Sequence, residues 1–130
     1  MKATVFDPLR KKRVALTPEE QVRQSLIRWL CTEKRYPETL MASEYTIVHN
    51  RRSYRCDLVV FSRTLQPWMI AECKAPGVSI SRETVDQVIR YNLALRAKYL
   101  VLTNGTVTFA CAWNESRQEY EPITRLPDYE

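Results

Sequence analysis

Two helix-like segments with three strand-like segments between them constrain the fold of this chain more than any other feature. Residues 17–20 read Thr-Pro-Glu-Glu, which supplies an N-cap threonine, a proline at the first helical position and a glutamate for a capping box. Apolar residues then recur at helical spacing and predict a helix over residues 17–34. A weaker helix start with the same spacing predicts a second helix over residues 81–96.

Runs rich in β-branched and aromatic residues between these helices are typical of strands. They cover residues 44–49, 55–62 and 68–74, with turn-forming residues between them. Residues 99–102 and 107–113 predict two further strands, joined at the two-residue hairpin signal Asn104-Gly105. Because a helix separates the third and fourth strands, these two are expected to be parallel. The predicted fold is therefore α/β, with an αβββαβ core and a mixed central sheet flanked by helices.

Length and composition indicate one domain with one core. The 130 residues are 45% apolar, which is enough for one core and too little for two. No apolar run could serve as a signal-peptide core or cross a membrane, so we expect a cytoplasmic protein without membrane contact. The four cysteines stand far apart among apolar neighbours, which favours buried thiols over zinc ligands or disulfides. We divide the chain into a basic segment (1–16), a folded domain (17–117) and an edge strand or tail (118–130).

The formal charge of +5 is unevenly distributed along the chain. Lys11 and Lys12 belong to a basic cluster that precedes the first helix, and Arg51, Arg52 and Arg55 form a second cluster in a loop. Both clusters could bind the phosphates of a nucleic acid, although most clusters of this kind are simply solvated surface.

Strand alternation brings together the residues with the clearest chemistry. Glu72 and Lys74 are two residues apart on one strand, so they share a face of the sheet. Asp57 lies on the preceding strand, in register to approach Glu72 if the connecting turn falls at residues 63–67. Two carboxylates about 4 Å apart repel by roughly 4 kcal/mol at an effective dielectric constant of 20, so both remain ionised only beside a compensating cation.

Lys74 supplies one positive charge to these carboxylates, and a divalent metal ion would supply more. Mg²⁺ suits them because it prefers oxygen ligands, keeps several waters and bridges carboxylates to phosphates, and Mn²⁺ could substitute for it. With a phosphodiester as the substrate, such an ion would lower the pKa of a water bound to it. Lys74 would orient that water or neutralise the negative charge that develops on the phosphate. The alternative is structural: Glu-x-Lys on a strand is usually a solvated ion pair, and an aspartate at a strand start is usually a turn or capping residue.

Further polar residues on the two predicted helices could reach the same site. A helical wheel places Glu19 toward the sheet, where its carboxylate needs a partner, whereas Glu20 points aside and fills the capping box. That partner is an arginine, a metal-bound water or a second metal ion. Gln87 and Tyr91 share a helix face and either reach the cleft or form the polar edge of an amphipathic helix. The single histidine, His49, is interpreted as a surface residue.

Four sequence blocks in order carry a resemblance to a known family. They are RCDLVVF (55–61), AECKAP (71–76), QVIRYN (87–92) and LTNG (102–105). Together they resemble the N-terminal nuclease domain of type I restriction enzyme R subunits, in a compact version within the PD-(D/E)XK superfamily. The resemblance covers about residues 17–113 and implies the αβββαβ core, Asp57 and Glu72 as metal ligands, and Lys74 as the catalytic lysine.

Two further motifs look like features of the same superfamily. Glu19 resembles its helix-borne acidic residue, which implies a further metal ligand, and Gln87 with Tyr91 resembles the Gln-x-x-x-Tyr motif of its RecB-like branches. Two departures are visible: Cys56 stands where a proline is usual, and no Gly-x-x-x-x-Gly-Lys-Ser/Thr loop is present for the ATPase that R subunits carry.

The leading functional hypothesis is a Mg²⁺-dependent deoxyribonuclease of restriction, defence or DNA processing. Contacts to phosphates should dominate its DNA binding. A separate motor or specificity subunit, or a homodimer that brings two sites to a duplex, would complete the activity. The alternative is a catalytically silent nucleic-acid-binding or assembly module with the same fold, and RNA as the substrate is a third hypothesis.

Overall fold

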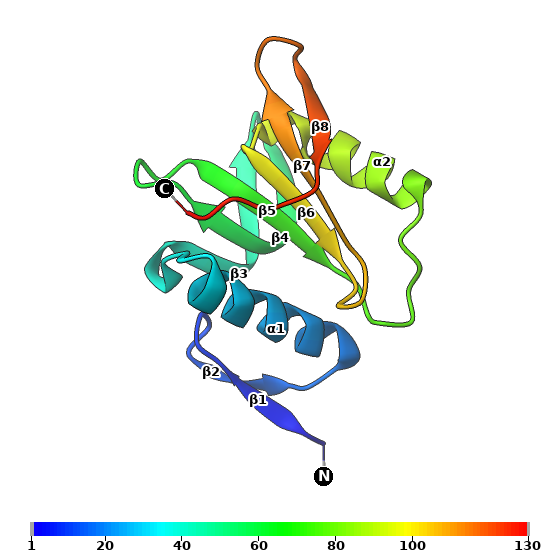
Figure 1. Cartoon of the computed structure of the whole chain (residues 1–130). Helices are drawn as coiled ribbons and strands as arrows, with labels where there is room; N and C mark the ends of the chain where they lie inside the picture. Colours follow the sequence, from blue (N-terminus) through cyan, green and yellow to red (C-terminus); the bar gives the residue numbers. More distant parts are fainter. Residues whose placement is uncertain (1, 130) are drawn as a thin grey trace.

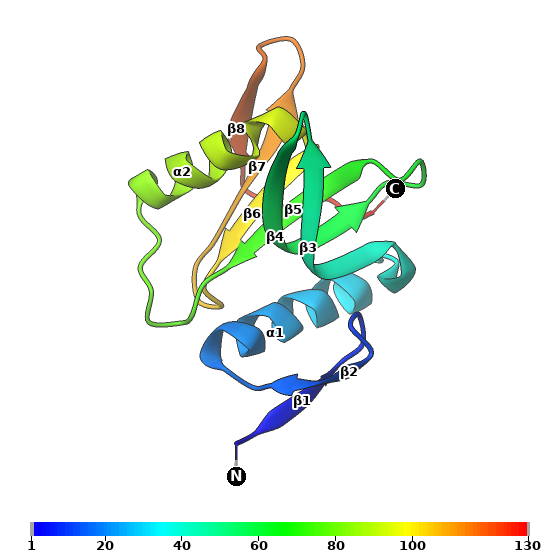
Figure 2. The same ribbon diagram turned by 180° about the vertical axis from the view of Figure 1, so that it is seen from behind.

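A computed structural model describes residues 2–129 and contains two α-helices and eight strands in that range. The helices are α1 (Pro18–Glu33) and α2 (Arg82–Asn92), with short 3₁₀ turns at η1 (Glu38–Leu40) and η2 (Leu93–Leu95). The strands are β1 (Thr4–Asp7), β2 (Lys12–Ala15), β3 (Met41–His49), β4 (Arg52–Phe61), β5 (Pro67–Cys73), β6 (Tyr99–Thr103), β7 (Thr108–Asn114) and β8 (Glu119–Ile123). Figure 1 shows this arrangement, and Figure 2 shows it from behind.

Six of the strands form one mixed sheet in the order β3-β4-β5-β6-β7-β8. Strands β5 and β6 are parallel, and the other neighbouring pairs are antiparallel. The connection between β5 and β6 contains α2, as a parallel pair requires. The αβββαβ core and the mixed α/β fold predicted from the sequence are confirmed.

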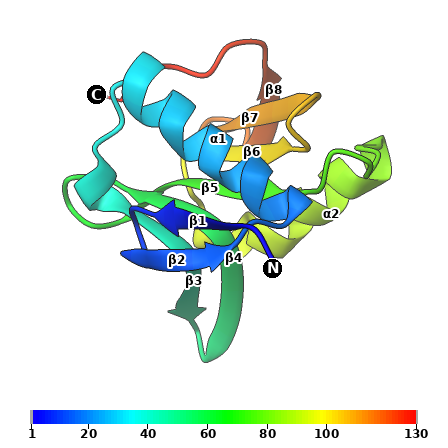
Figure 3. The same cartoon turned by 90° about the horizontal axis from the view of Figure 1, so that it is seen from below.

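The two helices cover opposite faces of this sheet (Figure 3). Side chains alternate along β5, so that Met69 and Ala71 pack toward α1 while Ile70 packs toward α2. Strand β4 alternates in the same way, with Leu58 toward α1 and Val59 toward α2. This two-sided burial fixes the register of β4 and β5, because a slip by one residue would exchange the two faces.

Helix α1 begins as its sequence predicts. The Thr17 hydroxyl accepts a hydrogen bond of 3.0 Å from the Glu20 amide, and a proline occupies the first helical position. Val22, Leu26 and Leu30 are buried against the sheet. At the far end, the amide of the cap residue, Lys34, donates to the Leu30 carbonyl.

Several boundaries differ from those predicted. Helix α2 ends at Asn92 because the chain turns through η2 and reaches Arg96 with a φ of 51°, which an α-helix cannot contain. The β6–β7 loop has four residues in place of two, because the Asn104 side chain accepts the amides of Thr106 and Val107 and forms its own turn. None of the helices in the described range is long and apolar enough to cross a membrane.

The chain ends add two elements to the core. Residues 4–15 form a separate hairpin, β1–β2, below α1 in Figure 1, where the sequence predicts only a basic segment. At the other end, β8 is the edge strand of the main sheet, paired with β7. Beyond it, Leu126 and Tyr129 are buried in the α1 side of the core. Tyr129 donates its hydroxyl to the Phe61 carbonyl at 2.9 Å, which ties the chain end to β4.

Candidate active site

The site lies where β4 separates from β5. The two strands pair as far as Leu58 and Ala71, and the next pair in this register would be Asp57 with Glu72. At that point the side chain of Asp57, and not its backbone, bonds to β5, since Oδ2 accepts the Cys73 amide at 2.8 Å. Strand β5 meanwhile remains paired with β6. The strands therefore open between Asp57 and Glu72, and both carboxylates border the opening.

A cleft of about 330 Å³ occupies this opening. Its polar lining comes from three elements: β4 contributes Arg55 and Asp57, β5 leads to Glu72 and Lys74, and α2 contributes Thr84, Gln87, Tyr91 and Asn92. The structure thus brings together the three central residues predicted from the sequence and the two predicted on the second helix. A second cleft of about 340 Å³ between α1 and β6–β7 is lined mainly by apolar side chains and contains no carboxylate.

Glu72 and Lys74 form an ion pair inside the cleft, with 2.9 Å between Lys74 Nζ and Glu72 Oε1. Each side chain is about one third exposed, at 35% and 33% respectively. The hydrogen bond to Glu72 raises the pKa of Lys74, and the charges of Asp57 and Glu19 act in the same direction. Lys74 is consequently an ammonium ion at neutral pH, so it can donate hydrogen bonds to an anionic oxygen but cannot serve as a base.

Asp57 experiences the opposite kind of environment. Burial raises the pKa of this carboxyl, and the nearby charge of Glu72 raises it further. The Cys73 amide, Arg23 and Lys74 oppose that rise. A second carboxylate and restricted access to water make the ionised form costly, so a cation in the cleft would relieve the cost.

The aromatic residue of α2 also supports β4. Tyr91 accepts a hydrogen bond of 3.0 Å from the Arg55 amide through its hydroxyl. Its ring meets Tyr54 edge to face at 5.5 Å, and the Arg52 guanidinium lies 5.1 Å from the Tyr54 ring. Gln87 lies one turn before Tyr91 and lines the same cleft with an exposed side chain. Tyr91 therefore holds the strand that carries Asp57.

The prediction for the first turn of α1 is wrong in its assignment of the two glutamates. The Glu19 side chain is 48% exposed, whereas the Glu20 side chain is 8% exposed. The helical wheel assumed one buried face, but the β1–β2 hairpin covers a second face and presents Arg10 to Glu20 at 2.6 Å. Glu19 does have an arginine partner, because Arg23 Nη2 lies 3.7 Å from its carboxylate.

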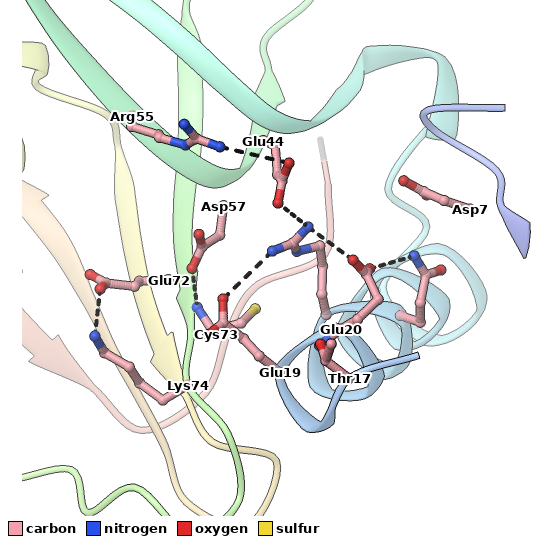
Figure 4. A network of polar contacts seen from close by, with 12 residues as sticks. Asp7, Thr17, Glu19, Glu20, Glu44, Arg55, Asp57, Glu72, Cys73 and Lys74 are labelled. Carbon is pink, nitrogen blue, oxygen red and sulfur yellow. Dashed lines mark hydrogen bonds and ion pairs between the residues drawn. The ribbon is translucent and has the colours of Figure 1, made fainter. Parts of the chain in front are cut away.

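Figure 4 shows how these acidic residues surround the site. Glu72 and Lys74 lie on one side of Asp57, while Glu19, Glu20 and Glu44 lie on the other. Glu19 borders a neighbouring hollow with Glu44 and Ala75 and is absent from the cleft lining.

The predicted phosphate-binding clusters are both at the surface. Arg51 lies in the β3–β4 turn, Arg52 begins β4, and the Arg55 side chain, 74% exposed, reaches the cleft. Lys11 and Lys12 are exposed at the tip of the β1–β2 hairpin and do not line the cleft. Of these five residues, Arg55 alone is placed at the candidate site.

The donor set suits a hydrated metal ion. No group of three histidine, cysteine, aspartate or glutamate side chains in the described range could enclose a metal. Asp57 and Glu72 nevertheless provide two carboxylates beside an open cleft. Mg²⁺ commonly binds one or two carboxylates and completes its shell with waters and phosphates, so the site fits this ion.

Thiol chemistry does not compete at this site. Burial raises the pKa of Cys56 to about 11 and that of Cys73 to about 12, so both remain protonated. All four cysteines are free; the predicted burial holds for three of them, whereas Cys31 is half-buried.

Sequence reasoning missed a network of paired charges behind Asp57, in which Asp7, Glu20 and Arg23 are buried. Its members Asp7, Arg10, Arg23 and Glu44 come from the hairpin, α1 and β3, and ion pairs connect them to one another and to Glu20. One signal was available: Arg23 falls between Val22 and Leu26 on the buried side of α1, where a charged residue requires a partner.

These features define an α/β domain with two carboxylates and a lysine at the opening between two strands. The chain belongs to the family described as type I restriction enzyme R protein N terminus, whose model matches residues 18–127.

Among solved structures, the chain is similar to the fragment structure of a protein described as an HsdR subunit of a type I restriction enzyme from Vibrio vulnificus YJ016. The two are 17% identical, with a TM-score of 0.58, over 85% of this chain and 23% of the other. The likeness therefore supports the fold, and this chain spans about a quarter of that fragment. No curated protein sequence matches the chain.

Proposed function

We propose that this domain is a Mg²⁺-dependent nuclease of the PD-(D/E)XK type that hydrolyses DNA phosphodiester bonds in a restriction system. The observation that carries the proposal is the convergence of Asp57, Glu72 and Lys74 at one open cleft. Membership of the R protein N-terminal family supports the restriction context.

Asp57 and Glu72 would hold the Mg²⁺ ion, and their position on adjacent strands sets the spacing of the two carboxylates. When bound, the ion lowers the pKa of a water and stabilises negative charge on the scissile phosphate. Glu72, which pairs with Lys74 at 2.9 Å, would share its carboxylate with such an ion and so loosen that pair. Lys74 is then available to donate to the attacking water or to a phosphate oxygen. Gln87 and Arg55, which line the same cleft, would contact the DNA backbone.

Type I restriction also requires translocation and sequence recognition. The sequence contains no ATP-binding Gly-x-x-x-x-Gly-Lys-Ser/Thr loop, so a motor and a specificity subunit, or further parts of a longer protein, would supply these activities. A second copy of this domain would provide the second site for a duplex cut.

Cleavage of supercoiled plasmid in Mg²⁺, in Mn²⁺ and with a chelator tests the proposal. Glu72→Gln should lower the rate about a hundredfold or more by removing a metal ligand, whereas Glu83→Gln, the same change at an exposed position at the start of α2, should not. DNA binding that is unaffected by metal, with no cleavage by the wild-type protein, would instead support a silent binding module.

A further inference from the structure

A network of paired charges lies behind Asp57, on the side away from the cleft (Figure 4). It begins at Asp7 in the β1–β2 hairpin, which precedes the residues matched by the family model. The Asp7 side chain is fully buried, and its carboxylate accepts the Leu9 amide and the Arg10 guanidinium. A buried carboxylate requires this degree of pairing.

Arg10 and Arg23 connect the hairpin to the main sheet. Arg10 lies 2.6 Å from Glu20 and 3.5 Å from Glu44. Arg23, whose side chain is 3% exposed, lies 3.2 Å from Glu20 and 3.3 Å from Glu44. Arg10 and Arg23, from different elements, therefore both pair with the same glutamate of β3, which Arg55 of β4 also approaches at 3.8 Å.

Glu44 occupies a special position in that strand. Its neighbours pair with β4 as Ser43 with Leu58 and Tyr45 with Cys56, so the residue directly opposite Glu44 is Asp57. Glu44 itself is missing from the ladder and has a φ of 48°. A glutamate in this region costs about 1 kcal/mol or more, so surrounding contacts must hold it there.

The geometry explains why this conformation matters at the site. Directly opposed residues of an antiparallel pair have Cβ atoms about 5 Å apart on the same face. An extended Glu44 would place a third carboxylate beside Asp57. Like charges at such positions destabilise the pair, and the extra carboxylate would be free to bind the same cation.

We propose that Arg23 and Arg10 are positioning residues that hold Glu44 out of the β3–β4 ladder and keep a third carboxylate away from Asp57. The inference rests on the proposed function, because it concerns the same metal site. It makes the β1–β2 hairpin part of the architecture of the site, although this hairpin lies outside the family match.

The experiment measures plasmid cleavage and, by calorimetry, Mn²⁺ affinity in the same set of variants. Arg23→Met should slow cleavage about tenfold or more, because a third carboxylate displaces the ion from its working position. Mn²⁺ affinity should rise about threefold or more, since the variant loses a cation and gains a carboxylate near Asp57. A role limited to stability would not move the two quantities in opposite directions.

Removal of Glu44 should cancel the effect. Glu44→Ala alone should leave both quantities within about threefold of wild type, and Arg23→Met/Glu44→Ala should recover cleavage and return Mn²⁺ affinity toward the wild-type value. Arg23→Lys should retain most activity because it keeps the charge. Arg28→Met, a change at an exposed arginine of the same helix, is the matched control.

The proposal would be overturned if Arg23→Met cleaved the plasmid at the wild-type rate. It would also be overturned if Arg23→Met lost both cleavage and Mn²⁺ affinity and Glu44→Ala failed to restore them. If Arg23→Met does not fold, Arg10→Met makes the same test through the hairpin. If the wild-type protein does not cleave DNA, the proposed function fails, but the Mn²⁺ measurements still decide this inference, with Asp57→Ala as the variant that lacks the site.

Discussion

The charged residues on the two sides of Asp57 are organised in opposite ways. In the cleft, Glu72 and Lys74 are each about one third exposed and have one another as a close partner. Behind Asp57, the buried residues Asp7, Glu20 and Arg23 each have several partners among the hairpin, α1 and β3. One side can still accept a cation or an anion, and the other is already compensated.

This difference shows how burial separates structural charges from those available for chemistry. A charge removed from water must be paired within the fold, because an unpaired one costs several kcal/mol. A partly hydrated charge can exchange its partner for a ligand at smaller cost. The same residue types therefore support the fold on one side and the candidate site on the other.

Replacing an aspartate by asparagine in the paired network and at the cleft tests this difference most strongly, because the two changes should affect stability in different ways. Asp7→Asn should lower the free energy of unfolding by about 3 kcal/mol at pH 7, because Arg10 loses a fully buried partner. Chemical denaturation measures this change. Asp128→Asn, which weakens the 3.8 Å pair of the exposed Asp128 with Lys34, is the control and should change stability by less than about 1 kcal/mol.

Acid should reduce the difference in the free energy of unfolding between the wild-type protein and Asp7→Asn. The Arg10 guanidinium and the Leu9 amide outweigh burial and lower the pKa of Asp7 below its ordinary value of 3.8. The stabilisation is therefore complete above pH 3.8 and is lost as the pH falls through the lowered pKa. A gap that stays constant down to pH 2 would contradict the assigned pairing.

Asp57→Asn should change the free energy of unfolding in the opposite direction from Asp7→Asn, and by a smaller amount. Burial raises the pKa of Asp57, so its favourable contribution is present below 3.8 and is lost as the pH rises through the raised value. At pH 7 the variant should be about 1 kcal/mol more stable, since the amide oxygen can still accept the Cys73 amide. Thermal unfolding checks this, and added Mg²⁺ should stabilise only the wild-type protein.

The smallest effect concerns the support of β4 by α2. Tyr91→Phe removes the hydroxyl that accepts the Arg55 amide and keeps the contact with Tyr54. Unfolding should require about 0.5 kcal/mol less, because the amide lies near solvent and water can replace the hydroxyl. Tyr45→Phe, at another exposed tyrosine, serves as the control.

Local periodicity was sufficient to predict the elements that carry the site. Alternation along β5 placed Glu72 and Lys74 together, and the short β4–β5 turn placed Asp57 opposite them. Gln87 and Tyr91 reach the cleft because the spacing of four residues puts both on one face of α2. These relations depend on residues close in sequence or on adjacent strands.

The errors arise where distant segments meet. Glu20 is buried because Arg10 of the hairpin covers it, and no pattern within α1 reports that contact. Strands β1 and β2 have four residues each and little apolar alternation, so they give a weak strand signal. The arginines that pair with Glu44 are likewise remote in sequence from it.

The central claim is that the cleft is a metal-dependent catalytic site, and Lys74→Ala tests it most directly. This change removes the ammonium group, leaves both carboxylates and should preserve Mn²⁺ binding. Cleavage of supercoiled plasmid in Mg²⁺ should then fall about a hundredfold or more while metal binding persists. Equal rates for wild type and Lys74→Ala, or cleavage that continues in the presence of a chelator, would contradict the account.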